Sequence, residues 1–345
     1  MSIGISVEHV ELARSLREWA ASLGGPEVVR ASEGDADATF ADTWKACVEM
    51  GVATIGLSES YGGGGGSVLD QAVALEACAH ELVPGPLLST AVAALVAPSA
   101  VIGDGAAVAL AFPSGLVGDL AGATHVVGAG GLLQEITSAE PVLGIDLSRR
   151  FGAATPAAQS DERLRRTTVT LAAAEASGVA RWCLDTAVEY AKVREQFGQK
   201  IGAFQAVKHL CAEMLETAEA VTAAAWDVAA AADSARAGQG DEQWAYAADV
   251  AAVTCFDGAV MVAKSCIQVL GGIGFTYEHD AHLYLRRALA LRGLVGDPDV
   301  AAIRLTTRAV DGVRRQVEVD LEGRDQDVRP GVRATAERIG ALDEA

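Results

Sequence analysis

The sequence predicts a mainly α-helical protein in which a short β-region separates two helical parts. Three long stretches, 161–194, 204–234 and 241–269, have apolar residues at helical spacing and are separated by short breaks. Between 104 and 160 the pattern changes to short strand candidates divided by turns that contain Gly and Pro. Antiparallel long helices with short connections pack as a four-helix-type bundle. The domains we expect are an N-terminal helical domain (1–103), a middle β-domain (104–160), a C-terminal bundle (161–320) and a tail (321–345).

The N-terminal part has the pattern of several helices up to residue 102. Val10, Leu12, Leu16 and Trp19 are compatible with a first amphipathic helix, and Asp42-Thr43 is a candidate N-cap for a second. The five glycines at 62–66 lack the preceding strand and the following Lys-Ser/Thr of a phosphate-binding loop. We therefore interpret them as a flexible turn before a helix at 69–82, which ends at Pro84-Gly85-Pro86.

The β-region and the end of the chain contain shorter elements. Strands are expected at 106–112, 125–127 and 142–145. After the three long helices, shorter helices are expected at 278–292 and 298–315, and the charged tail contains Pro330. No internal repeat is apparent.

Charge and hydropathy limit the classes of partner. Lys and Arg number 27 against 46 Asp and Glu, a formal net charge of −19. Such a chain repels nucleic acid and anionic membranes, so we expect neither as a partner. The apolar stretch 87–102 resembles a short membrane span, but its flanking prolines indicate helices buried in protein. The N-terminus lacks a basic region before an apolar core, so no secretory signal is expected.

Cysteine and histidine positions do not suggest a metal site. The six cysteines are scattered without a Cys-x-x-Cys pair, so free buried thiols in a reducing cytoplasm are expected. His279 and His282 are spaced as a possible metal pair, but no third ligand is near. We favour a cap or surface role for both, assign His209 to helix packing, and expect no metal.

The segment 190–214 is the strongest functional candidate. Glycines at 198 and 202 interrupt the helical pattern before a second helix leaves from residue 204. The residues at this corner are Arg194, Gln196, Phe197 and Gln205. A guanidinium suits a phosphate, and an adjacent aromatic ring suits a flat heterocycle. The alternative is an αα-hairpin with a surface arginine and a buried phenylalanine, which the Arg-x-x-Phe-Gly pattern alone would favour.

Two motifs together resemble one family. Arg194-Glu195-Gln196-Phe197-Gly198, Ile201-Gly202 and Phe204-Gln205 resemble the signature of acyl-CoA dehydrogenases, and Gln268-Val-Leu-Gly-Gly-Ile-Gly-Phe275 is a second match. The resemblance implies the family's fold, FAD as cofactor, and α,β-dehydrogenation of an acyl-CoA thioester with a carboxylate base. The residues implied to contact the adenosine and pyrophosphate of FAD are Arg194, Gln196, Phe197, Gln205, Gln268, Gly271, Gly272 and Gly274. Glycines suit this role because backbone N–H groups then approach a diphosphate closely.

Other family features are missing from the sequence. The motifs around the flavin ring, Thr-Glu-Pro…Gly-Ser-Asp and Trp-Ile-Thr, do not occur between 100 and 170, which implies a shortened middle domain. The two usual base positions carry Val295 and Thr168, so no conventional catalytic base is expected. The carboxylates that could replace it are Asp297, Asp299, Glu278 and Glu175. We favour structural roles for all four, and Asp297 is the best remaining candidate.

This combination resembles the reduced subunit of actinobacterial, two-component acyl-CoA dehydrogenases of the steroid side-chain type. The run 278–287 is similar to that group. The resemblance implies an α2β2 assembly with a full-length paralogue that supplies the flavin bed and the base. It also implies an acyl-CoA substrate and an electron-transfer flavoprotein or similar acceptor. The alternatives are a self-sufficient homomeric dehydrogenase with a displaced base and a non-catalytic scaffold of the same fold.

Overall fold

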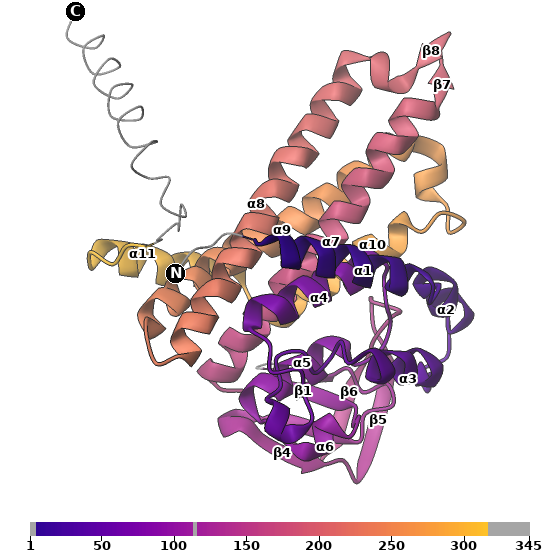
Figure 1. The fold of residues 1–345 in the computed structure, drawn as a ribbon. Helices are drawn as coiled ribbons and strands as arrows, with labels where there is room; N and C mark the ends of the chain where they lie inside the picture. The colour runs from indigo at the N-terminus through magenta and orange to yellow at the C-terminus, as the bar shows by residue number, and fades with distance from the viewer. Residues whose placement is uncertain (1–4, 113–115, 317–345) are drawn as a thin grey trace, which may run out of the picture.

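The fold was analysed in a computed structural model that describes residues 5–112 and 116–316 (Figure 1). A bundle of long helices carries a small six-stranded sheet on one side and the tip of a helical hairpin on the other. The predicted mainly α-helical fold with a small β-region is therefore confirmed. The predicted tail at 321–345 lies outside the described residues.

The N-terminal helices begin at well-defined caps. They are α1 (Val7–Ala21), α2 (Gly25–Ala31), α3 (Ala41–Met50), η1 (Glu59–Tyr61), α4 (Val68–His80), α5 (Leu87–Val96) and α6 (Ala100–Gly103). Ser67 and Asp70 form a capping box at the start of α4. The cap predicted at Asp42-Thr43 is wrong, because α3 already begins at Ala41 after Phe40, whose φ is 52°.

The glycine run at 62–66 is a packed loop rather than a flexible turn. The amide of Gly65 donates to the carbonyl of Leu57 at 2.8 Å. A Cβ atom on Gly63 would lie 2.3 Å from the same carbonyl oxygen. These glycines are therefore needed because the backbone passes too close to its neighbour for a side chain.

The sheet is mixed, and the sequence predicted only part of it. Its strands are β1 (Val108–Ala111), β2 (Val117–Gly118), β3 (His125–Gly128), β4 (Leu132–Glu135), β5 (Ser138–Leu143) and β6 (Arg150–Thr155). Their order is β4-β3-β1-β2-β6-β5, with β1 and β3 parallel and the other pairs antiparallel. The predictions for β1 and β3 are confirmed, whereas the third predicted strand overlaps only the end of β5. The other strands are short or lack apolar alternation, so periodicity did not detect them.

The long helices form the core of the molecule. They are α7 (Glu162–Val193), α8 (Gln205–Arg236) and α9 (Asp241–Leu270), followed by η4 (Gly271–Phe275), α10 (Ala281–Val295) and α11 (Pro298–Val310). α4 packs directly on α7. A Cβ atom on Gly178 would lie 2.2 Å from the carbonyl oxygen of Glu76, so a glycine permits this close approach. The six cysteines are free thiols on these helices and on α3 and α4.

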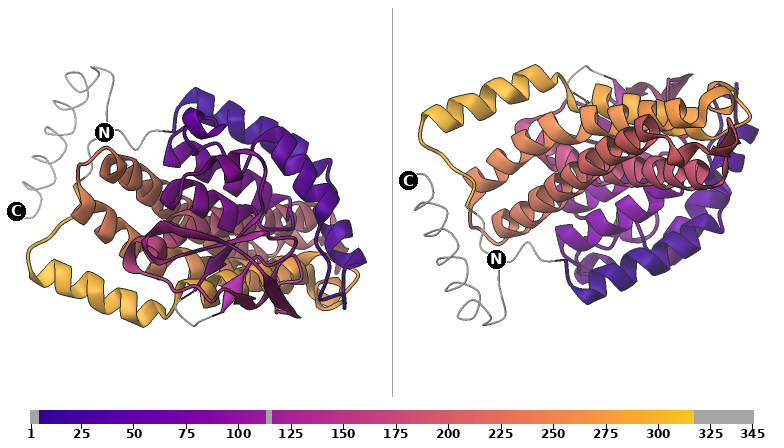
Figure 2. Two further views of the ribbon diagram at one scale, coloured as in Figure 1. Left: turned by 90° about the horizontal axis from the view of Figure 1, so that it is seen from below. Right: turned by 90° about the horizontal axis from the view of Figure 1, so that it is seen from above.

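The bundle also explains the apolar character of α9. Within the described residues, Asp241–Phe275 is long and apolar enough to cross a membrane by length and composition. However, α9 packs against α7, α8, α10 and α11, as the core helix of a bundle does. The N-terminal helices lie on one flank of this bundle, and α11 lies on the opposite flank (Figure 2).

Candidate functional site

The first candidate motif forms a small β-hairpin between α7 and α8. Its strands are β7 (Glu195–Gln196) and β8 (Gln199–Lys200). The turn residues Phe197 and Gly198 have φ values of 50° and 79°, as in a two-residue type I′ turn. Periodicity predicted a plain helix–helix corner here, because a strand of two residues has no measurable alternation. Gly202 then lets the following η3 turn (Ile201–Ala203) pack against α7.

The aromatic and the guanidinium of this hairpin face solvent. Phe197 is 92% exposed, and its ring meets the edge of Phe204 at 6.1 Å between centroids. The alternative interpretation with a buried phenylalanine is therefore wrong. Arg194 is also exposed, and within the described residues its guanidinium makes no hydrogen bond or ion pair. Both groups are free to contact a molecule outside the chain.

The two glutamines of the hairpin region have internal partners. Gln196 donates to the carbonyl of Glu195 at 2.7 Å. Gln205 lies at 2.8 Å from the ring of His209, one turn further along α8. The ring of His209 is exposed, so its contact is with this glutamine rather than with the core.

The second candidate motif is the glycine turn that ends α9. Gly271 has a φ of 62°, and there are no atoms within 4 Å of a Cβ atom placed on Gly271 or Gly272. A Cβ atom on Gly274 would instead lie 2.7 Å from the carbonyl oxygen of Ile267. The backbone is therefore approachable from outside at Gly271 and Gly272, whereas Gly274 is required by packing.

A hollow of about 500 Å³ lies beside this turn. Gln268 lines it together with Lys264, Tyr277 and Arg286. Lys264 and Arg286 make no ion pair within the described residues, and sequence reasoning did not single them out. A signal was available for Lys264, because it stands one helical turn before Gln268 on the same face of α9.

The two motifs lie at the same end of the bundle (Figure 1). α8 begins at the hairpin and α9 ends at the glycine turn, and these two helices are antiparallel neighbours. Among the described residues, no hydrogen bond or ion pair joins the motifs. The candidate site therefore consists of two solvent-facing patches on one end of the chain.

Neither of the two residues predicted to occupy a base position, Thr168 and Val295, is an acid. Thr168 is buried in α7, and its hydroxyl donates to the carbonyl of Leu164 at 2.8 Å. Val295 is the last residue of α10. Asp297 caps α11 by accepting from the amide of Asp299 at 2.9 Å, which is the cap geometry that its sequence context indicated. Glu278 is exposed in the loop before α10.

Glu175 belongs to a buried ionic cluster, which consists of Asp119, Asp146, Arg149, Glu175 and Arg287. All five are at most 2% exposed. Glu175 pairs with Arg149 and lies 3.8 Å from Nη1 of Arg287. Burial raises the pKa of Glu175, although the two guanidiniums oppose this. The arrangement ties α7 and α10 to the loops of the sheet.

Arg287 is the link between α10 and the β-region in this cluster. Its Nε lies 2.7 Å from Oδ2 of Asp146, and its guanidinium also donates to Ser148. A further hydrogen bond of 3.3 Å reaches the carbonyl of Val83. Burial alone would raise the pKa of Asp146, but Arg287 and Arg149 outweigh burial and lower it.

The histidine pair does not form a metal centre in the described part of the chain, where no group of three metal-ligating side chains occurs. The ring of His279 accepts from the amide of Ala281 at 3.1 Å, at the start of α10. The ring of His282 packs against Tyr277 at 5.1 Å. Burial lowers the pKa of both histidines.

Comparison with known proteins identifies the family. The N-terminal domain of acyl-CoA dehydrogenases matches residues 6–106, and their C-terminal domain matches residues 162–310. IpdE2 of Mycolicibacterium smegmatis, an acyl-CoA dehydrogenase, is 32% identical over 82% of this chain and 94% of its own length. The chain belongs to the acyl-CoA dehydrogenase family, whose members are FAD-dependent oxidoreductases.

A longer relative is also similar over nearly the whole chain. The acyl-CoA dehydrogenase FadE34 of Mycobacterium tuberculosis is 40% identical over 96% of this chain. The chain spans only 52% of the length of that relative.

Solved structures of the family share this fold. A variant of the steroid ACAD Tcur3481-Tcur3483 has a TM-score of 0.76 at 23% identity, covering 88% of this chain and 98% of its own. The ChsE4-ChsE5 complex from Mycobacterium tuberculosis gives a TM-score of 0.72 at 20% identity, covering 90% and 99%.

Proposed function

We propose that this chain is a subunit of an FAD-dependent acyl-CoA dehydrogenase that holds the nucleotide end of the cofactor. A paralogous partner supplies the flavin bed and the catalytic base. The observation that carries the proposal is the hairpin tip, where an exposed arginine, without a partner among residues 5–112 and 116–316, stands beside a phenylalanine that is 92% exposed. Large exposed aromatics and unpaired guanidiniums at one point are typical of a surface that binds a ligand or a partner.

The residues at this end of the chain suit the diphosphate and adenosine of FAD. Arg194 offers a charged, forked donor, and the open backbone at Gly271 and Gly272 offers N–H groups. Phe197 offers an exposed ring to a heterocycle. These residues would bind and orient the nucleotide, and FAD held there would supply the acceptor for a hydride from the acyl chain.

The need for a partner follows from the acids of this chain. Neither Thr168 nor Val295 can remove a proton as a carboxylate would. Asp297 is engaged as a helix cap, and Glu175 is paired inside the ionic cluster. On this proposal the base for α-proton removal comes from the partner.

The known relatives support a two-part enzyme. FadE34 is about twice as long as this chain, so nearly half of it is left for a second unit. The name of one similar structure describes a steroid ACAD, and the name of another describes a complex of ChsE4 with ChsE5. We propose an α2β2 assembly in the cytoplasm that acts on an acyl-CoA thioester of the steroid side-chain type. Its electrons would pass to an electron-transfer flavoprotein or a similar acceptor.

The test compares the chain alone with the chain co-expressed with a full-length paralogue. Flavin per chain is measured by absorbance, and dehydrogenation is measured with a dye acceptor and acyl-CoA. We expect little flavin and no turnover from the chain alone, and both from the complex. About one FAD per chain in the chain alone would refute the two-part enzyme and favour a homomeric dehydrogenase. Failure of both preparations to bind flavin would favour the non-catalytic scaffold.

A further inference from the structure

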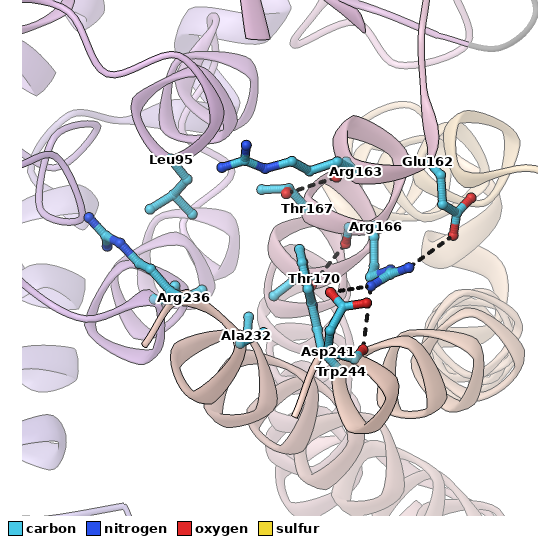
Figure 3. Close-up of a pocket in the computed structure, with 12 residues that line it drawn as sticks. Leu95, Glu162, Arg163, Arg166, Thr167, Thr170, Ala232, Arg236, Asp241 and Trp244 are labelled. Atoms are coloured by element: carbon cyan, nitrogen blue, oxygen red, sulfur yellow. Dashed lines mark hydrogen bonds and ion pairs between the residues drawn. The ribbon is translucent and has the colours of Figure 1, made fainter. Parts of the chain in front are cut away.

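A second cavity, of about 490 Å³, opens at the other end of the long helices (Figure 3). It lies between the start of α7 and the end of α8, with walls from α4, α5 and the start of α9. None of the residues assigned to the nucleotide or to the base positions lines it. Its size is in the range of small-molecule sites, which is about 300–1,000 Å³.

Two exposed arginines line this cavity from different helices (Figure 3). Arg163 comes from the first turn of α7, and Arg236 is the last residue of α8. Within the described residues, neither guanidinium makes a hydrogen bond or an ion pair. Asp161 lies near Arg163, but its oxygens already accept from the amides of Leu164 and Gly130. Asp233 lies near Arg236, but its oxygens accept from the amides of Val68 and Leu69. Both positive charges are therefore available to a ligand.

The acids that line the cavity are neutralised by other arginines. Asp241 pairs with Arg166 at 2.9 Å, and Glu162 pairs with Arg165 at 2.7 Å. Arg166 is held further by its position over the ring of Trp244, 4.9 Å from the ring centroid. The lining itself carries three arginines, Arg163, Arg166 and Arg236, against two acids, a surplus of one positive charge in a chain whose net charge is −19. An anion is the ligand that this surplus favours.

The rest of the lining is mainly aliphatic. Val68, Leu95 and Ala232 contribute apolar surface from three different helices. The indole N–H of Trp244 donates to Thr170 at 3.0 Å, and Arg166 covers one face of its ring. The ring therefore adds apolar area and has no free donor for a polar ligand.

We propose that this cavity binds an amphiphilic anion, an aliphatic chain that carries a carboxylate or a phosphate head. The head lies between Arg163 and Arg236, and the chain lies against Leu95, Val68 and Trp244. The proposal is independent of the nucleotide site, which lies at the opposite end of α8.

The test is calorimetric titration of the full chain with octanoate and with octyl phosphate, below their micelle concentrations. We expect saturable binding of at least one, and the tighter of the two identifies the preferred head group. Octan-1-ol has the aliphatic chain without the anionic head, and inorganic phosphate has the anion without the chain. Each should bind about tenfold more weakly than the amphiphile, or worse.

The variant is Arg163→Gln with Arg236→Gln, and the matched control is Arg292→Gln. Arg292 pairs with Asp257 on the surface and does not line the cavity. We expect the double variant to bind the amphiphile about tenfold more weakly or worse, with the control unchanged. Both arginines are exposed, so a thermal melt should show a folded variant. Equal affinity in the double variant, or no saturable binding of either amphiphile to the wild type, would overturn the proposal. Arg194→Ala should leave this binding unchanged, which separates it from the nucleotide site.

Discussion

Arg194 and Arg287 both lie in segments that resemble the family, yet their surroundings are opposite. Arg194 stands at the hairpin tip in solvent, without an ionic partner in the described part of the chain. Arg287 is 1% exposed and is bound by Asp146, Ser148 and the carbonyl of Val83. A charge in water needs no partner, whereas a charge taken out of water is tolerated only when it is paired. The first arginine is therefore available for binding, and the second stabilises the fold.

The same contrast separates the carboxylates. Glu175 lies inside the buried ionic cluster with two guanidiniums, while Asp297 caps a helix at the surface. Neither position combines a dry pocket with access to a substrate, which a general base needs. We therefore expect that replacing a residue of the ionic cluster lowers the free energy of unfolding. Replacing a surface residue should either weaken ligand binding or have no effect.

The largest effect is expected from Arg287→Met. The change leaves Asp146 buried without its closest cation, so the free energy of unfolding should fall by about 3–5 kcal/mol. Urea unfolding followed by circular dichroism measures this. The matched control is Arg286→Met at the neighbouring position, which lines the hollow by the glycine turn and should change stability by less than about 0.5 kcal/mol. Equal losses for the two variants would contradict the comparison.

The next effect concerns Arg194→Ala in the co-purified complex. Loss of a charged hydrogen bond to the diphosphate should weaken FAD retention by about 1.5–3 kcal/mol, or roughly tenfold to a hundredfold. Arg194→Lys should fall between the variant and the wild type, because a lysine keeps the charge but not the fork. Flavin content after dialysis is the measurement, and the melting temperature of the chain should not change. Unaltered flavin content in Arg194→Ala would remove this residue from the nucleotide site.

A smaller change in the free energy of unfolding is expected from replacing His80, whose surroundings are intermediate between those of Arg194 and Arg287. Its ring lies 2.7 Å from Glu81 and 3.5 Å from Asp185. Burial alone would lower the pKa of His80, but these two carboxylates outweigh burial and raise it above 6.5. The stabilisation by the charged ring is therefore complete below pH 6.5 and is lost as the pH rises through the folded-state pKa.

The measurement compares wild type with His80→Gln in urea at about pH 5.5 and about pH 8.5. The difference in the free energy of unfolding should be larger at the lower pH. His209→Gln is the control, since that ring is exposed on α8. A difference for His80→Gln that does not depend on pH would show that the ring is not charged in the folded state.

The smallest effect is expected from Asp297→Asn. Asparagine caps a helix about as well as aspartate, so stability should change by only a few tenths of a kcal/mol. Turnover of the complex should stay near the wild-type value if the base lies in the partner. Dye-linked dehydrogenation with flavin content checked is the assay. A loss of roughly a hundredfold or more, with flavin unchanged, would instead make Asp297 the general base.

The sequence by itself determined the long helices and the family. Apolar residues at helical spacing over about 30 residues set the limits of α7, α8 and α9 to within two residues of the predictions. The Arg-Glu-Gln-Phe-Gly and Gln-Val-Leu-Gly-Gly-Ile-Gly segments are local motifs, so they can be recognised without a fold. The prediction that this chain lacks a conventional base also comes from the sequence alone, because it depends only on which residues occupy two positions of the family pattern.

Only the tertiary structure decided the sheet, the ionic cluster and the second cavity. β6 pairs along its whole length with β5, yet it lacks an apolar alternation and depends on its neighbours for its conformation. Asp119, Arg149, Glu175 and Arg287 are distant in sequence and meet because four different elements converge. Likewise, Arg163 and Arg236 line one cavity only because α7 begins beside the end of α8. Periodicity describes one helix or strand at a time, whereas a buried charge or a cavity depends on which elements pack together.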